Sequence, residues 1–238
     1  MNQNRDDRRL TVKKWTRDQI AATIDHAVLS PDATDLDVIE QCKLGRELGV
    51  ASVCVRPTDV PLAAAALKGS TTVVSAVVAF PHGAAQPETK AKEARLCIAD
   101  GARELDMVLN IGKLRSGEDD WVRHDIEAVV EEARPHGVLV KVILEVCFLT
   151  DEEIVRGCRL AQAAGADFVK SSTGFGTGGA TPEAIALMVA TVGGTMRVKA
   201  SGGIRTYADA VRYLNLGCAR IGASSGTRTI CESAPEHG

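Results

Sequence analysis

The chain has 238 residues, of which 45% are hydrophobic and 25% are charged, and its formal net charge is −3. This length and composition are typical of one globular domain, or of two small ones at most. The small negative charge gives no electrostatic basis for binding nucleic acid or an anionic membrane, and an aromatic content of 3% is too low for base-stacking surfaces.

Cysteine and histidine spacing gives no sign of disulfides or of a metal site. The seven cysteines are scattered, without a CxxC pair, and the five histidines form no HExxH motif. We therefore expect reduced thiols in a cytoplasmic protein that needs no metal and no other cofactor. The first residues are too polar for a signal peptide, and no apolar run is long enough to span a membrane.

Short β-rich runs recur along the chain. The first is "IAATIDHAVL", which starts at Ile20. Seven more follow glycines, namely Gly49, Gly69, Gly101, Gly137, Gly165, Gly193–Gly194 and Gly217. Because glycine readily adopts the left-handed conformation just past a helix C-terminus, each of these glycines indicates a helix that ends where a strand is about to begin. The pattern predicts eight strands.

Helical segments lie between these runs. Residues 35–48 and 121–133 are expected to be helical, and Thr150 with Glu153 forms a capping-box pattern before apolar residues at helical spacing. Thr181 followed by Pro182 is a favourable helix start.

Strands that alternate with helices indicate parallel βαβ units, and eight such units in about 250 residues predict a single (β/α)8 barrel, the TIM-barrel fold. A doubly wound open sheet is the alternative, but its usual GxGxxG motif after the first strand is missing. We expect a polar N-terminal arm over residues 1–18, the catalytic barrel over residues 19–230 and a short tail over residues 231–238.

Charged side chains alternate with apolar ones in four successive strands. Since side chains of a strand alternate between faces, the apolar faces should pack on the helices and the charged faces should point into the barrel. The inward charges near the C-terminal ends of these strands are Asp106, Lys141, Lys170 and Lys199. Barrels carry active sites at that end, although a structural ion-pair network or lysines that extend to the rim would give the same pattern.

Two lysines beside a carboxylate suit the chemistry of an imine (Schiff base). A dry pocket and a neighbouring cation both lower the pKa of a lysine and release a nucleophilic amine. The iminium that it forms with a carbonyl draws electrons, so an adjacent C–C bond can break or form without a metal, while the carboxylate moves protons through a water. The spacing alone does not say which lysine attacks.

Small residues follow the last two strands, in "SGGIRT" (residues 201–206) and "GASSG" (residues 222–226). Such loops let backbone N–H groups approach an oxyanion, and barrels of this kind often bind phosphate after strands seven and eight. Glycines that only make tight turns are the alternative, but the two loops together favour a phosphorylated substrate.

The chain resembles deoxyribose-phosphate aldolases, class I enzymes that interconvert 2-deoxyribose 5-phosphate with acetaldehyde and glyceraldehyde 3-phosphate. The resemblance covers residues 24–226 and is most specific in "DFVKSSTGF" and "VKASGGIR"; the other motifs are "DHAVLSPDAT", "SVCVRP", "VVAFPHG", "ELDMVLNIG", "KVILEV" and "RIGASSG".

The resemblance implies a role for each of the inward charges. Lys170 would form the imine, Lys199 would lower its pKa, Asp106 would act as acid and base through a water, and Lys141 would support Asp106. The residues that would hold phosphate are Gly174, Gly202, Gly203, Ser224 and Ser225. Cys54 lies where the family has a cysteine near the pocket, and we assign it no catalytic role.

Two residues depart from the family pattern. Ala27 and Val146 stand where threonine is usual, so substrate preference and rate could differ. The C-terminal "PEHG" offers no tyrosine of the kind that reaches the site in some members. A different lysine-dependent aldolase or a transaldolase-like enzyme, and a non-catalytic sugar-phosphate binder, remain alternative functions. The family implies a homodimer or a larger homo-oligomer.

Overall fold

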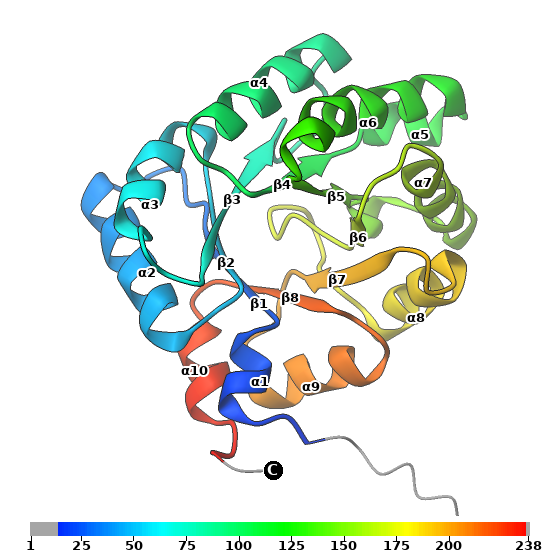
Figure 1. The fold of residues 1–238 in the computed structure, drawn as a ribbon. Coiled ribbons are helices and arrows are strands. Elements are labelled where there is room, and N and C mark those ends of the chain that lie inside the picture. The colour runs from blue at the N-terminus through cyan, green and yellow to red at the C-terminus, as the bar shows by residue number, and fades with distance from the viewer. Residues whose placement is uncertain (1–13, 237–238) are drawn as a thin grey trace, which may run out of the picture.

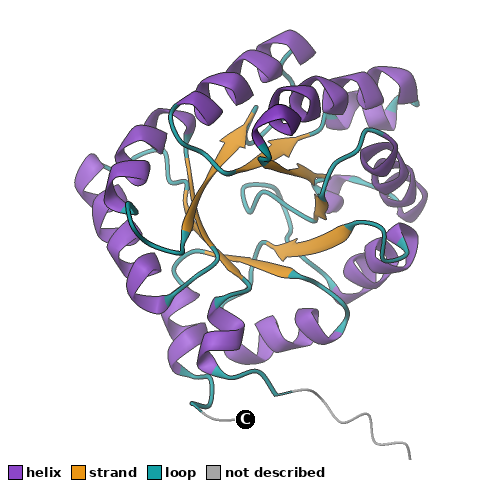
Figure 2. Cartoon of the chain, viewed as in Figure 1, coloured by secondary structure: helices purple, strands orange, loops and turns teal. Residues whose placement is uncertain are grey.

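A computed structural model describes residues 14–236 of the chain. Eight parallel strands pair in sequence order, and the first pairs with the last, so the sheet closes into a barrel with helices around it (Figures 1 and 2). The strands are β1 (Ile24–Val28), β2 (Ser52–Val55), β3 (Val73–Val78), β4 (Glu104–Val108), β5 (Leu139–Ile143), β6 (Phe168–Lys170), β7 (Arg197–Ser201) and β8 (Arg220–Ala223). The predicted (β/α)8 barrel is confirmed.

Helices form the outer ring (Figure 2); α2 to α9 lie between successive strands, while α1 precedes β1 and α10 follows β8. They are α1 (Arg17–Ala21), α2 (Asp35–Leu48), α3 (Val60–Ala66), α4 (Pro87–Ala99), α5 (Ile111–Arg115), α6 (Asp119–Ala133), α7 (Asp151–Ala163), α8 (Pro182–Val192), α9 (Tyr207–Asn215) and α10 (Thr227–Glu232). Three short 3₁₀ helices are η1 (Pro57–Asp59), η2 (Arg134–His136) and η3 (Val146–Phe148).

Local signals fix where most helices begin and end. The predicted helix over residues 35–48 is α2. The Thr150–Glu153 capping box and the Thr181 N-cap are both present, at the starts of α7 and α8. Helix α6 begins at Asp119, two residues before the expected start. Every glycine predicted to separate a helix from a strand has a positive φ, which L-residues with a Cβ rarely adopt.

The structure corrects the start of the first strand. The first strand begins at Ile24 rather than Ile20, because Thr16 and Gln19 form a capping box that starts α1 and places Ile20 in a helix. At the other end, α10 runs from Thr227 to Glu232, and Cys231 is fully buried. Most of the expected N-terminal arm, residues 1–13, lies outside the described residues.

The faces of the strands are divided as predicted. Leu105 and Met107 of β4, Val142 of β5 and Val198 of β7 belong to the apolar core between barrel and helices. The alternate side chains of the same strands point into the barrel, where the charged ones pair with one another. Phe168 is buried, and the centroid of its ring lies 4.0 Å from the guanidinium carbon of the solvent-exposed Arg197, a cation–π contact.

A buried ion pair outside the barrel ties α4 and α6 to the end of β4. Lys90 Nζ lies 2.6 Å from Asp125 Oδ2, and both side chains are fully inaccessible to solvent. Lys90 also donates to the Val108 carbonyl (2.8 Å), and the Asn110 amide donates to Asp125 (3.2 Å). Burial lowers the pKa of Lys90 and raises that of Asp125, so each depends on the other to stay charged. The pair holds the segment just after Asp106.

We expect Lys90→Met to lower the free energy of unfolding by about 3–5 kcal/mol, because Asp125 would be left as an unpaired buried carboxyl. The double change Lys90→Met/Asp125→Leu should recover most of this loss. Urea denaturation followed by circular dichroism measures both. The control is Arg95→Met, which removes the solvent-exposed Arg95–Glu132 pair and should change stability little. A double variant no more stable than Lys90→Met would contradict the explanation.

Candidate active site

Asp106 lies at the centre of a charge cluster inside the barrel. Its Oδ1 atom accepts from Lys141 Nζ at 2.8 Å, and its Oδ2 atom accepts from Lys170 Nζ at 2.8 Å and from Lys199 Nζ at 2.7 Å. Ser75 Oγ also donates to Oδ1 (3.2 Å). All of these side chains are buried. The structure therefore brings together the four inward charges that the sequence predicts.

Strand register explains how residues so far apart in sequence meet. Asp106 is paired with Lys141 across β4 and β5, and Lys170 is paired with Lys199 across β6 and β7. Register partners in a parallel sheet share a face, so both pairs point inward. Lys170 is aligned with Ile143, two residues beyond Lys141, which places the Lys170–Lys199 pair nearer the C-terminal mouth.

Asp25 and Arg220 complete the cluster, and sequence reasoning missed both. Asp25 Oδ2 lies 2.5 Å from Lys199 Nζ and 3.5 Å from Lys141 Nζ, and Asp25 Oδ1 accepts from Arg220. Arg220 also pairs with Glu104 at 2.8 Å, which in turn lies 2.5 Å from Lys141 Nζ. The signal was available: Asp25 and Arg220 each interrupt an apolar strand of the predicted barrel. The two strands concerned, β1 and β8, meet only when the barrel closes.

The members of this interior charge cluster are not evenly paired. Within the described chain they are four cations and three carboxylates: Lys141, Lys170, Lys199 and Arg220, with Asp25, Glu104 and Asp106. Lys141 touches three of the carboxylates, while Lys199 and Arg220 touch two each. Lys170 touches Asp106 alone. A buried charge without sufficient pairing is costly, so Lys170 is the cation that most readily loses its proton.

The pKa shifts of the three lysines follow from the number of carboxylates that each one contacts. Burial lowers the pKa of Lys170, the charge of Lys199 lowers it further, and the single carboxylate of Asp106 does not compensate. Burial acts on Lys199 too, but Asp106 and Asp25 together outweigh it and its pKa is raised. The carboxylates around Lys141 raise its pKa as well. The ammonium groups hold the pKa values of Asp106 and Asp25 below their usual range, against the opposing effect of burial. The pKa of Lys170 is thus lowered, while the pKa values of Lys199 and Lys141 are raised.

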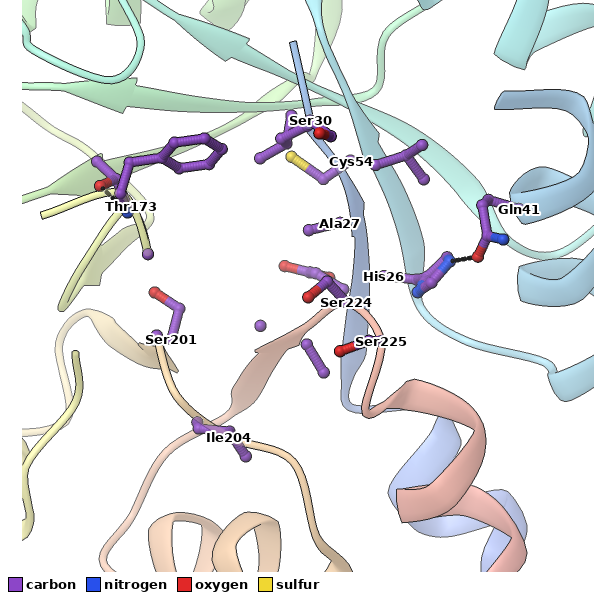
Figure 3. A pocket seen from close by; sticks show the side chains of 18 of the residues that line it. His26, Ala27, Ser30, Gln41, Cys54, Thr173, Ser201, Ile204, Ser224 and Ser225 are labelled. Atoms are coloured by element: carbon purple, nitrogen blue, oxygen red, sulfur yellow. Dashed lines mark hydrogen bonds between the residues drawn. The ribbon is translucent and has the colours of Figure 1, made fainter. Parts of the chain in front are cut away.

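A cavity of about 640 Å³ opens above the cluster at the C-terminal ends of the strands. Lys170 and Lys199 reach its wall, whereas Asp106 and Lys141 are not among the lining residues and lie behind these two lysines. Thr173 and Ser201 face Ala27 and Ser224 across this space (Figure 3). An amine with a lowered pKa is therefore accessible to a small molecule.

Three loops bring small residues to the same cavity. All five predicted phosphate-binding residues line it: Gly174, Gly202, Gly203, Ser224 and Ser225. Two of the loops touch through glycines, since a Cβ on Gly179 would lie 2.2 Å from the Gly202 carbonyl oxygen. That contact requires glycine at position 179 and fixes the loop after β6 against the loop after β7.

The loop after β6 is also held by Glu145. The Glu145 carboxylate accepts from the Thr173 hydroxyl and from the Thr173 amide (3.2 Å), next to Gly174. Glu145 has φ of 57°, in the left-handed region that is strained for a residue with a side chain. The strained conformation directs the Glu145 carboxylate toward Thr173 rather than into the charge cluster.

Neither a metal cluster nor a membrane-spanning helix is found in the part of the chain that the structure describes. Residues 14–236 contain no group of three His, Cys, Asp or Glu side chains arranged to hold a metal ion. None of their helices is both long and apolar enough to cross a bilayer. Cys54 lines the cavity, and burial together with Asp106 raises its pKa, which keeps it as a thiol.

A closed (β/α)8 barrel with buried lysines and a carboxylate below its C-terminal mouth is typical of barrel aldolases, lyases that make and break C–C bonds. Comparisons with known proteins give the family. The model of the DeoC/LacD family aldolases matches residues 19–232, and the chain belongs to this family.

The sequence relatives agree over nearly the whole chain. The deoxyribose-phosphate aldolase of Geobacillus sp. is 52% identical over 89% of this chain and 94% of its own length. That of Listeria innocua is also 52% identical, over 91% of this chain and 96% of its own length. The tetrameric deoxyribose-phosphate aldolase structure from Aeropyrum pernix is 32% identical, with a TM-score of 0.85 over 92% of each chain. The chain is therefore an aldolase.

The different pairing of the two lysines predicts how Lys170 titrates. Lys199→Met should raise the pKa of Lys170, because it removes a neighbouring positive charge and leaves Asp106 with one cation fewer to share. The ¹³Cε shift of Lys170, assigned with Lys170→Arg, measures this pKa by NMR. Lys43→Met, a change at an exposed lysine, is the control and should leave the Lys170 titration in place. An unchanged or lower pKa in Lys199→Met would contradict the proposed coupling.

Proposed function

We propose that the protein is a class I deoxyribose-phosphate aldolase in which Lys170 forms the imine. The observation that carries this assignment is the difference in carboxylate contacts between the two lysines that reach the cavity. Lys170 contacts one carboxylate, and Lys199 contacts two. The names of the closely similar relatives support deoxyribose 5-phosphate as the substrate. Lys199 remains charged and keeps the pKa of Lys170 low.

The reaction would run as follows. The neutral amine of Lys170 attacks C1 of the open-chain aldehyde, and loss of water gives an iminium. The C2–C3 bond then breaks: its electron pair moves into the C1–C2 enamine, the C3 hydroxyl loses its proton, and C3 becomes the aldehyde of glyceraldehyde 3-phosphate. Protonation of the enamine at C2 and hydrolysis release acetaldehyde and restore Lys170. The reverse sequence joins the two aldehydes.

Asp106 would move the protons through a water, with Lys141 as its support. The charges of Lys141 and Lys199 lower the pKa of Asp106, so it passes a proton on rather than keeping it. Lys141 is held by three carboxylates of the cluster and keeps Asp106 oriented. Neutral Lys170 no longer competes for Asp106, which frees one side of the carboxylate for the water.

The phosphate group would bind to the loops around Gly174, Gly202–Gly203 and Ser224–Ser225. These loops line the cavity beside Lys170, and glycine and serine leave their backbone N–H groups open to an anion. Ala27, which also lines the cavity, adds no hydroxyl there. Val146 is buried in the apolar core. The contacts to the sugar hydroxyls would then rest on other groups.

Assembly and location are part of the same proposal. The tetramer of the Aeropyrum pernix relative supports a homodimer or a larger homo-oligomer. The seven free cysteines and the absence of a membrane-spanning helix in residues 14–236 are compatible with a cytoplasmic enzyme.

Borohydride reduction in the presence of deoxyribose 5-phosphate tests the nucleophile. We expect one stable adduct, located on Lys170 by peptide mass mapping, and none in Lys170→Arg. An adduct on Lys199, or on no lysine, would refute the assignment. The matched control, Lys113→Arg, changes a lysine that lies over the Trp121 ring and outside the cavity, and it should leave trapping intact.

Metal removal separates this mechanism from a metal-dependent aldolase. Because the proposed electron acceptor is the iminium on Lys170, activity should survive exhaustive treatment with a chelator. Turnover is measured as release of glyceraldehyde 3-phosphate before and after treatment. Loss of activity that zinc restores would point to metal-assisted chemistry instead.

A donor screen distinguishes other lysine-dependent aldolases. Acetaldehyde should be accepted as the donor with glyceraldehyde 3-phosphate, and a clear preference for a ketone donor would indicate a transaldolase-like enzyme. A sugar-phosphate binder without turnover would show neither cleavage nor a trapped adduct.

A further inference from the structure

His26 is a buried titratable group that the proposed reaction does not use. It follows Asp25 in β1 but points to the other side of the strand, toward α2, while Ala27 points into the cavity (Figure 3). Its side chain is almost completely buried. It nevertheless borders the cavity at its edge, beside the loop after β8.

Both ring nitrogens of His26 have a partner. Nε2 lies 2.9 Å from Gln41 Oε1 of α2, and Nδ1 lies 2.8 Å from the hydroxyl of Thr227. The Gln41 oxygen can only accept, so Nε2 carries the proton. Burial lowers the pKa of His26, which keeps the ring neutral. Nδ1 is then an acceptor, and the Thr227 hydroxyl donates to it.

Thr227 connects His26 to the loop that would hold phosphate. It is the first residue of α10 and directly follows Ser224–Gly226, and its amide donates to the Ser224 carbonyl (3.1 Å). Its side chain is fully buried, so its hydroxyl has no water to replace His26. A shift of Thr227 would therefore move the Ser224–Gly226 backbone.

The same loop is packed against its neighbour. A Cβ on Gly226 would lie 2.7 Å from Arg205 Cα and 3.0 Å from the Arg205 carbonyl oxygen. Arg205 belongs to the loop after β7 that carries Gly202 and Gly203. The position of Thr227 thus affects both loops through direct backbone contact.

We propose that His26 is a positioning residue whose Nδ1 atom, by accepting the Thr227 hydroxyl, fixes the Ser224–Gly226 loop for phosphate binding. This inference rests on the proposed function, because it assigns that loop to the substrate phosphate. It predicts an effect on phosphate affinity that is separate from the chemical step at Lys170.

Two replacements of His26 separate its two hydrogen bonds. His26→Asn retains an acceptor, Oδ1, close to the position of Nδ1, and gives up the bond to Gln41. His26→Gln extends an amide to the Nε2 position, where it can still donate to Gln41, and gives up the bond to Thr227. Thr227→Val removes the same hydroxyl from the other side, and Thr227→Ser retains it.

We expect His26→Gln and Thr227→Val to raise KM for deoxyribose 5-phosphate about three- to tenfold, the usual effect of one lost hydrogen bond, with kcat nearly unchanged. The dissociation constant of inorganic phosphate, measured by calorimetry, should rise by a similar factor. His26→Asn and Thr227→Ser should retain most of the phosphate affinity. For 2-deoxyribose, which lacks the phosphate, kcat/KM should stay within about twofold in all four variants.

Equal losses in His26→Asn and His26→Gln, or equal losses with 2-deoxyribose and its phosphate, would overturn the proposal, since both indicate a general structural role. If His26→Gln does not fold, the Thr227 pair gives the same comparison. A wild-type protein without aldolase activity refutes the proposed function, and the calorimetric comparison still tests His26. A wild-type protein that does not bind inorganic phosphate refutes the phosphate loop and the role of His26 together.

Discussion

The site depends on one electrostatic constraint, the excess of one cation over carboxylates in the interior charge cluster of the barrel. Ionised groups inside a protein are stable only when paired, and here every carboxylate of the cluster is shared between cations. The deficit falls on Lys170, which has one carboxylate contact. Its pKa is lowered because burial and the charge of Lys199 together outweigh that single contact. Lys199 keeps its charge because it contacts two carboxylates, Asp25 and Asp106.

The charge cluster is complete only because the sheet closes into a barrel. Asp25 from β1 and Arg220 from β8 reach the cluster only because the first and last strands pair. Without Asp25, Lys199 would share Asp106 with the other two lysines and would be no better paired than Lys170. The register across β4–β5 and β6–β7 then sets two levels, with Asp106 and Lys141 below Lys170 and Lys199. The lower pair lies behind the cavity, and the upper pair lines its wall.

The loops at the mouth are held by polar side-chain contacts and by one close backbone approach, not by apolar packing alone. Glu145 fixes Thr173, His26 fixes Thr227, and Gly179 allows the loop after β6 to touch Gly202. Each contact joins a loop to an element that is remote in sequence. The proposed mechanism thus separates two tasks: the interior charges would tune the amine of Lys170, and the contacts behind the loops would hold the backbone that binds the phosphate.

Sequence by itself determined the order of the elements, the inward direction of Asp106, Lys141, Lys170 and Lys199, and the small residues at the mouth. These follow from local rules, since alternation along a strand and glycine after a helix need no knowledge of distant residues. It misplaced the start of the first strand by overlooking the Thr16–Gln19 capping box, which is also a local signal. Only the tertiary structure decided which lysine has the fewest carboxylate partners and what His26 touches. Those answers depend on distances between groups that lie far apart in the chain and meet only when the barrel closes.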